Sequence, residues 1–262
     1  MKLSVSNIGR AEAQDKEILR KLQTLGFSGL EIAPTRIFPT APYDQIVEAE
    51  ACARDLKAEY GLQLSSMQSI WYGVTRKIAE SAENRQWLLS YTQEADQFAT
   101  AMECTNLVFG CPKNRICTAP GDEEILNEFL LQCAKVAHPY GVVIALEANP
   151  TIYGTNYINT TAQALSLLQE HRHPALQLNL DMGTVIQNAE SLSWISDSPE
   201  LIHHVHISEP GLRPIVLRPQ QLQLKDLLQE ASYSGFVSLE MGKNEDPALL
   251  DRSLLYVRDT FL

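Results

Sequence analysis

The sequence predicts a (β/α)8 barrel, and three observations lead to this fold class. The chain has 262 residues, which is the usual length of this architecture. Short β-branched or apolar runs alternate along it with longer amphipathic segments, as in parallel strands joined by helical crossovers. Eight strand segments of this kind follow one another without a linker, so we expect a single domain over residues 1–262. A doubly wound open sheet is the alternative.

The expected strands are short, and several are apolar throughout, as strands covered on both faces are. They are residues 3–6, 29–32, 62–66, 106–109, 142–147, 176–181, 202–207 and 236–240. Helical periodicity falls between them, at residues 17–25, 46–59, 82–102, 123–137, 161–170, 220–231 and 247–261. Glycine occurs just before four of the strands, where a helix commonly ends in the left-handed region, at Gly26, Gly61, Gly141 and Gly235.

An ionisable side chain ends each of the last four expected strands. These residues are Glu147, Asp181, His206 and Glu240. The active sites of such barrels form at the C-terminal ends of the strands, so we expect the four side chains at one rim. Carboxylates gathered there repel one another unless a cation lies among them. Carboxylate oxygens with one imidazole suit Mn²⁺, Co²⁺, Mg²⁺ or Zn²⁺, and the sequence therefore predicts one divalent metal ion.

These four residues, and the barrel that carries them, resemble the xylose-isomerase-like superfamily of sugar isomerases and epimerases, which also contains endonuclease IV. The resemblance covers essentially the whole chain. It implies that Glu147 and Glu240 both bind the metal and exchange protons with the substrate carbon from opposite faces. Asp181 and His206 would be metal ligands only.

Two positions depart from the ketose 3-epimerase pattern within this superfamily. The histidine that those enzymes carry three positions after the sixth-strand aspartate is replaced here by Thr184. Their second glutamate after the fifth strand is also missing, since the segment is Glu147-Ala-Asn-Pro-Thr-Ile-Tyr153. We therefore expect a different substrate pocket. The endonuclease branch fits poorly, because its trinuclear zinc site needs histidines on early strands and the first histidine here is His138.

Residues in the loops after the strands are candidates for substrate contacts. Trp71 is expected either to form an apolar wall for a sugar ring or to cover the barrel mouth. Glu31 is expected either to form an ion pair with Arg36 or Lys113 or to contact the substrate. Four basic side chains suggest an anionic group on the sugar, namely Arg36, Lys113, Arg115 and Arg213. Glu209 is a further candidate for a substrate contact. His204 shares the face of His206 by alternation and is expected to pack behind it.

Charge and hydropathy limit the partners. The net charge of −11 argues against nucleic acid, because such binding draws on clustered Lys and Arg. No apolar run is long enough to span a membrane, and the odd set of five cysteines suggests reduced thiols, so a cytoplasmic location is expected. A homodimer is a further expectation, taken from the resemblance.

The expected function is a metal-dependent sugar or sugar-phosphate isomerase or epimerase. It would remove a proton next to a carbonyl and pass through an enediolate. A metal-dependent dehydratase or aldolase acting on a keto-polyol is the alternative with the same ligands, since fold alone does not separate these reactions. A sugar-binding protein without turnover is a third class, which a glutamate on each face of the substrate would not require.

Overall fold

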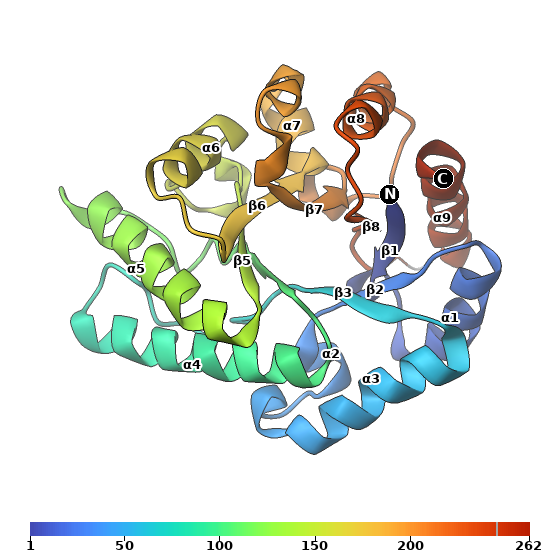
Figure 1. Ribbon diagram of the computed structural model, residues 1–262, viewed down its shortest axis with the longest axis horizontal. Helices are drawn as coiled ribbons and strands as arrows, with labels where there is room; N and C mark the ends of the chain where they lie inside the picture. Colours follow the sequence, from blue (N-terminus) through green and yellow to red (C-terminus); the bar gives the residue numbers. More distant parts are fainter. Residues whose placement is uncertain (245) are drawn as a thin grey trace.

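The computed structural model of the protein, which describes residues 1–244 and 246–262, contains a closed barrel of eight parallel strands (Figure 1). The strands are β1 (Lys2–Ser6), β2 (Gly29–Ile32), β3 (Gln63–Met67), β4 (Asn106–Phe109), β5 (Val143–Glu147), β6 (Leu176–Asp181), β7 (Ile202–Ile207) and β8 (Phe236–Leu239). Each pairs with the next along the chain, and β1 closes the barrel by pairing Lys2 with Phe236 of β8. The predicted fold class is confirmed.

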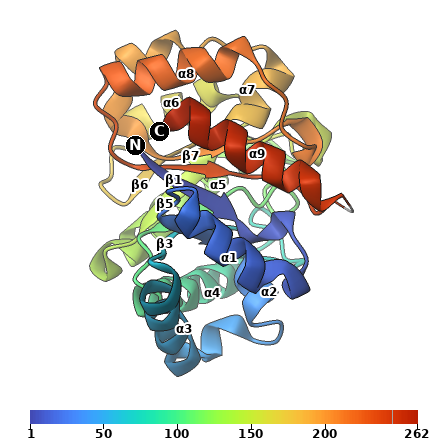
Figure 2. The same cartoon turned by 90° about the vertical axis from the view of Figure 1, so that its right-hand side faces the viewer.

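Helices surround the strands on the outside, as Figures 1 and 2 show from two directions. They are α1 (Asp15–Thr24), α2 (Pro34–Ile37), α3 (Ile46–Tyr60), α4 (Ala82–Ala101), α5 (Asp122–Ala137), α6 (Thr161–Glu170), α7 (Met182–Asn188), α8 (Pro219–Glu230) and α9 (Pro247–Phe261). The short helices α2 and α7 were not predicted, because four and seven residues are too few to display helical periodicity. No helix in the described part of the chain has the length and hydropathy that a membrane crossing requires.

Three of the four glycines before strands adopt the left-handed conformation that the sequence predicts. Gly26, Gly61 and Gly141 have φ values of 80°, 65° and 68°. Gly235 does not adopt this conformation, and glycine is needed at this position for a different reason. A Cβ atom there would meet the ring of Tyr233 at 2.4–2.9 Å, so this position needs glycine for space.

The barrel interior contains polar side chains that hydrogen-bond to one another. Ser4 and Ser65 share a hydrogen bond of 2.6 Å between their hydroxyl groups, and the Asn106 amide donates to Ser66 at 2.8 Å. Apolar side chains from the strands and the inner faces of the helices fill the layer between them. The helical layer is therefore held by apolar packing, while polar groups remain inside the barrel for the site at its rim.

Candidate active site

The four residues predicted as metal ligands lie together at the C-terminal rim of the barrel. Nδ1 of His206 is 3.1 Å from Oε2 of Glu147 and 3.3 Å from Oε2 of Glu240. Donor atoms of Asp181, Glu147 and His206 all lie within 4.8 Å of one another. The side chains come from β5, β6 and β7 and from the residue that follows β8, so consecutive strands supply them.

The Asp181 carboxylate is fixed by the first turn of α7. The backbone N–H and the hydroxyl of Thr184 donate to Oδ2 at 2.7 and 2.9 Å, and the Ser208 hydroxyl donates to Oδ1. Asp181 thus caps the helix that begins directly after its strand. Gly183 makes room for this arrangement, because a Cβ atom there would meet the Ser208 hydroxyl at 2.9 Å and Oδ2 of Asp181 at 3.1 Å.

Two asparagine amides hold the Glu147 carboxylate, one at each oxygen. Asn149 donates to Oε1 at 2.8 Å, and Asn179 donates to Oε2 at 2.7 Å. The guanidinium of Arg115, which is fully buried, donates to the Asn149 side-chain oxygen and to the Glu147 backbone oxygen, both at 2.7 Å. Arg115 therefore orients Asn149 so that its amide N–H faces Glu147.

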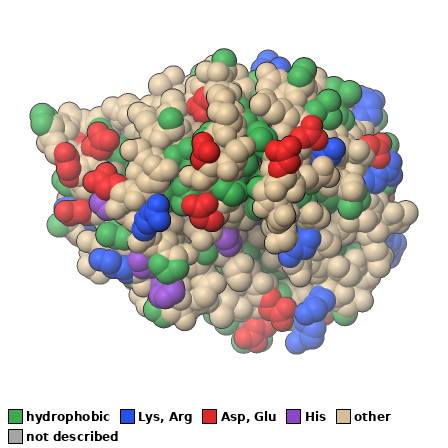
Figure 3. Space-filling view, turned by 45° about the horizontal axis from the view of Figure 1, so that its top comes forward, with side chains coloured by type: hydrophobic (Ala, Val, Ile, Leu, Met, Phe, Trp, Pro, Cys, Tyr) green, Lys and Arg blue, Asp and Glu red, His purple; other side chains and the backbone are tan. Residues whose placement is uncertain are grey.

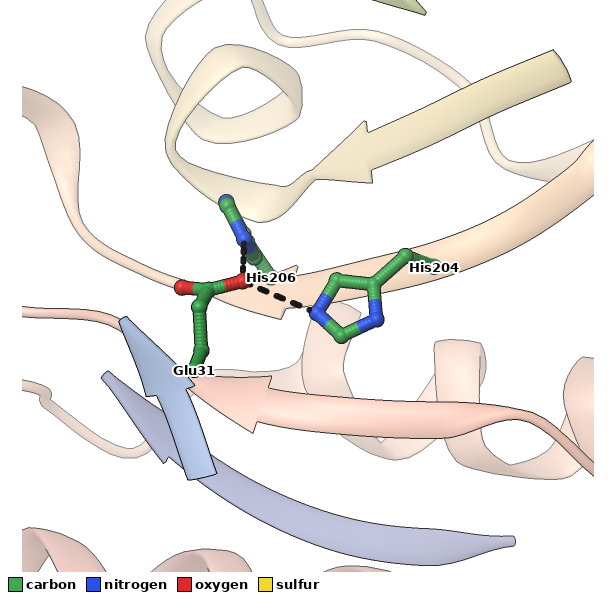
Figure 4. Close-up of side chains that lie close together, drawn as sticks. All are labelled: Glu31, His204 and His206. Carbon is green, nitrogen blue, oxygen red and sulfur yellow. Dashed lines mark hydrogen bonds and ion pairs between the residues drawn. The ribbon is translucent and has the colours of Figure 1, made fainter. Parts of the chain in front are cut away.

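The second ring nitrogen of His206 faces a buried carboxylate that the sequence analysis placed elsewhere. Oε2 of Glu31 lies 2.8 Å from Nε2 of His206 and 3.1 Å from Nε2 of His204 (Figure 4). Gln68 donates to the other Glu31 oxygen at 3.0 Å. The prediction that Glu31 pairs with Arg36 or Lys113 is wrong, because the Glu31 side chain is fully buried and points into the barrel.

Burial and charge act in opposite directions within this cluster. Burial raises the pKa of Glu240 to about 7 and also raises the pKa of Asp181. Burial opposes protonation of His206, yet the carboxylates of Glu31, Glu240 and Glu147 prevail and raise its pKa well above the usual value. For Glu31, the neighbouring histidines outweigh burial and lower the pKa.

The donor set suits a divalent cation. Burial disfavours the charged forms of Asp181 and Glu240. A cation among Glu147, Asp181, Glu240 and Nδ1 of His206 would compensate their negative charge. Glu31 would accept a hydrogen bond from the N–H at Nε2, so that the lone pair of Nδ1 is available to the cation. The residues present therefore fit the group that the sequence predicts.

A pocket of about 190 Å³, which we call the inner pocket, opens beside the cluster. Glu147, Asp181 and Glu240 line it together with Asn149 and Tyr153. The Tyr153 hydroxyl accepts a hydrogen bond from the backbone N–H of Gly211 at 2.9 Å, which leaves its own proton for another acceptor. Among the described residues, no Lys or Arg lines the inner pocket.

Two of the predicted substrate contacts are buried by other partners. Trp71 is 3% exposed, packs edge-on against Phe109 and donates to the hydroxyl of Thr92 at 3.1 Å. Its ring does not line the inner pocket, so the alternative expectation of hydrophobic cover describes its position. Glu209 is 2% exposed, and Arg218 donates to both of its carboxylate oxygens at 2.6–2.7 Å.

Of the four predicted basic contacts, Arg115 is buried beside Asn149, and the other three occupy different parts of the rim. Arg213 is exposed, and its Nε donates to the backbone oxygen of Pro210 at 3.0 Å. Lys113 is exposed on the loop after β4. Arg36 contacts Asp15 at 3.2 Å and lines a second, wider cavity. The structure thus separates these cations and does not form one anion-binding cluster from them.

Comparison with known proteins agrees with the fold. The family profile described as xylose isomerase-like TIM barrel matches residues 19–260. The chain belongs to this family. No curated protein matches the chain.

Solved structures of this fold resemble the protein over nearly its full length. The 3-keto-D-glucoside 4-epimerase YcjR from E. coli is 23% identical, with a TM-score of 0.77 and 99% of each chain covered. The D-psicose 3-epimerase from Clostridium cellulolyticum, solved with D-tagatose, is 20% identical, with a TM-score of 0.80, and covers 100% of this chain and 98% of its own. The probable 3-DHS dehydratase AsbF from Bacillus anthracis is 17% identical, with a TM-score of 0.72 and 98% of each chain covered. At these identities the likeness is one of fold.

Proposed function

We propose that the protein is a divalent-metal-dependent isomerase or epimerase of a small keto sugar or sugar phosphate. The observation that carries the proposal is the placement of two glutamate carboxylates beside one imidazole nitrogen, with His206 Nδ1 3.1 Å from Glu147 and 3.3 Å from Glu240. Both line a pocket whose size suits part of a monosaccharide. Solved epimerases of keto sugars share the fold.

The two glutamates suit proton transfer at a carbon next to a carbonyl. A metal held by Glu147, Asp181, His206 and Glu240 would polarise the carbonyl and make the neighbouring C–H more acidic. Glu240, whose carboxylate lines the inner pocket, then accepts the proton as general base. Glu147, held by two amides, protonates the opposite face of the enediolate, and the configuration at that carbon is inverted.

Loss of a hydroxyl group from the same enediolate is the second candidate reaction. The structural likeness to a probable dehydratase supports this reaction as an alternative. The two reactions begin with the same proton transfer and differ only in what the substrate loses afterwards. Nucleic acid is not a proposed substrate: the net charge is −11, and Lys and Arg side chains are scattered over the face shown in Figure 3.

Incubation in D₂O tests the proposal before the natural substrate is known. The Mn²⁺-loaded protein is mixed with a panel of ketoses, ketose phosphates and keto acids, and deuterium incorporation is followed by NMR. We expect deuterium on a carbon next to the carbonyl of at least one ketose or ketose phosphate, with its epimer or isomer as product. A dehydrated product would select the second candidate. A panel without any exchange, at full metal occupancy, would contradict both.

A further inference from the structure

A second cavity of about 850 Å³, which we call the outer groove, adjoins the inner pocket at the same rim of the barrel. Ile8 and Ser69 line both cavities, so the two lie next to each other. The groove lies over the segments that follow β1, β2, β3 and β8, whereas the carboxylates of the inner pocket lie at the ends of β5 and β6 and directly after β8. The volume of the outer groove falls within the usual range of ligand sites, about 300–1,000 Å³. The inner pocket, at about 190 Å³, is smaller than this range.

Charge distinguishes the two cavities. The inner pocket is lined by three carboxylates. Cations line the outer groove instead, namely Arg10, Arg36 and Lys243, and Glu12 is the one carboxylate among the described residues that line it. An anionic group in the inner pocket would face Glu147, Asp181 and Glu240, while the outer groove offers it donors.

One carboxylate serves two guanidinium groups in this groove. Asp15 lies 2.7 Å from Nε of Arg10 and 3.2 Å from Nη2 of Arg36. Arg10 is buried and Arg36 is 20% exposed, so Asp15 holds both side chains in place and compensates only one of their charges. A guanidinium that is already positioned loses little conformational entropy when it binds an anion.

We propose that the outer groove is an anion-binding subsite for the non-reacting end of the substrate. The substrate is then a keto sugar that carries a phosphate or carboxylate, with its carbonyl end in the inner pocket. The exposed ring of Tyr72, which is 71% accessible and lines the groove, provides an apolar face for the carbon chain between the two ends. This inference rests on the proposed function for the position of the carbonyl, but anion binding itself does not depend on turnover.

Calorimetric titration of matched ligands tests the subsite. Inorganic phosphate, D-fructose, D-fructose 6-phosphate and D-fructuronate are titrated into the Mn²⁺-loaded protein, together with D-ribulose and D-ribulose 5-phosphate. A charge-assisted hydrogen bond contributes about 1.5–3 kcal/mol. We therefore expect at least one anionic sugar to bind about tenfold or more tightly than its neutral partner, and the phosphate and carboxylate arms to identify the group.

Variants then locate the anion. Arg36→Gln should abolish the preference for the anionic sugar, and Lys243→Gln, which changes an exposed side chain, should reduce it at least twofold. Lys113→Gln is the matched control, because Lys113 is an exposed cation of the same rim that does not line the groove.

Equal affinities within every pair, or a preference that survives in both groove variants, would overturn the subsite. Deuterium exchange without anion preference leaves the proposed function standing and removes the subsite. Anion preference without deuterium exchange supports the anion-binding subsite and contradicts the proposed function.

Discussion

Oε2 of Glu31, on β2, lies 2.8 Å from Nε2 of His206, on β7, across the interior of the barrel. The contact fixes the imidazole so that Nδ1 faces Glu147 and Glu240. A carboxylate behind a metal-binding histidine orients the ring and increases its basicity. Glu31 thus acts on the proposed metal site without being one of its ligands.

Replacing Glu31 by Gln should therefore weaken metal binding while the four proposed ligands remain. Loss of such a partner typically lowers metal affinity about 10–100-fold. Titration of the metal-free variant with Co²⁺ or Mn²⁺, followed by calorimetry, measures the change. Glu17→Gln, on the exposed face of α1, is the control and should bind as the wild type does. An unchanged affinity in Glu31→Gln would mean that His206 is oriented by packing alone.

Metal uptake should strengthen as the pH rises through 7. In the metal-free protein burial raises the pKa of Glu240 to about 7 and raises that of Asp181, so below pH 7 protons compete with the metal for these oxygens. Metal titrations between pH 5.5 and 8 should show the affinity falling at the acid end. One ion per chain is expected at pH 8, and Asp181→Asn and His206→Ala should lower that occupancy. Full occupancy in both variants would remove these residues from the ligand set.

A buried carboxylate on α4 should make stability depend on pH. Asp96 is fully buried, neither of its oxygens has a hydrogen-bond partner among the described residues, and burial raises its pKa to about 8. The unfolded chain releases this proton near the ordinary pKa of about 4. Between about pH 4 and 8 only the folded state holds the proton, so this group lowers the free energy of unfolding by about 1.4 kcal/mol per pH unit as the pH rises.

Asp96→Asn should remove that contribution. Urea denaturation at pH 5, 6, 7 and 8 should show the variant gaining stability relative to the wild type as the pH increases. Asp226→Asn, whose side chain is 64% exposed, is the control and should follow the wild-type pH profile. Parallel curves for Asp96→Asn and wild type would show that Asp96 is ionised in the folded protein.

The sequence predicted those features that depend on local pattern. Eight apolar runs defined the barrel, which the structure and the family profile confirm. The same runs placed Glu147, Asp181, His206 and Glu240 at strand ends, and the structure brings these side chains together. The alternation of β7 also placed His204 on the face of His206, where it meets Glu31.

Contacts between distant segments were beyond the reach of such patterns. Asn149 and Asn179 donate hydrogen bonds to the Glu147 carboxylate. No pattern in the sequence indicates that an asparagine amide will meet a carboxylate 2 or 32 residues away. The sequence did not show that Arg36 would contact Asp15, because Asp15 lies at the start of α1, 21 residues earlier in the chain. Charged loop residues choose among several partners of similar energy, and tertiary packing decides between them.

The two proposed catalytic glutamates differ in their surroundings, and this difference predicts different defects. Each oxygen of Glu147 accepts an amide hydrogen bond, at 2.8 and 2.7 Å, whereas the carboxylate of Glu240 contacts the His206 imidazole at 3.3 Å. Glu240→Gln preserves shape and an oxygen ligand but removes the base. We expect it to retain metal at lower affinity and to lose about 10²–10⁴-fold in both turnover and deuterium exchange.

Glu147→Gln should block conversion between epimers but leave exchange from the epimer whose proton faces Glu240. Single-substrate incubations in D₂O, one for each epimer, separate the two cases by NMR. Exchange from both epimers at the wild-type rate in each variant would make the glutamates metal ligands without a proton-transfer role. The base would then have to be another group of the inner pocket, and Tyr153, whose hydroxyl lies beside the same carboxylates, would be the next residue to replace.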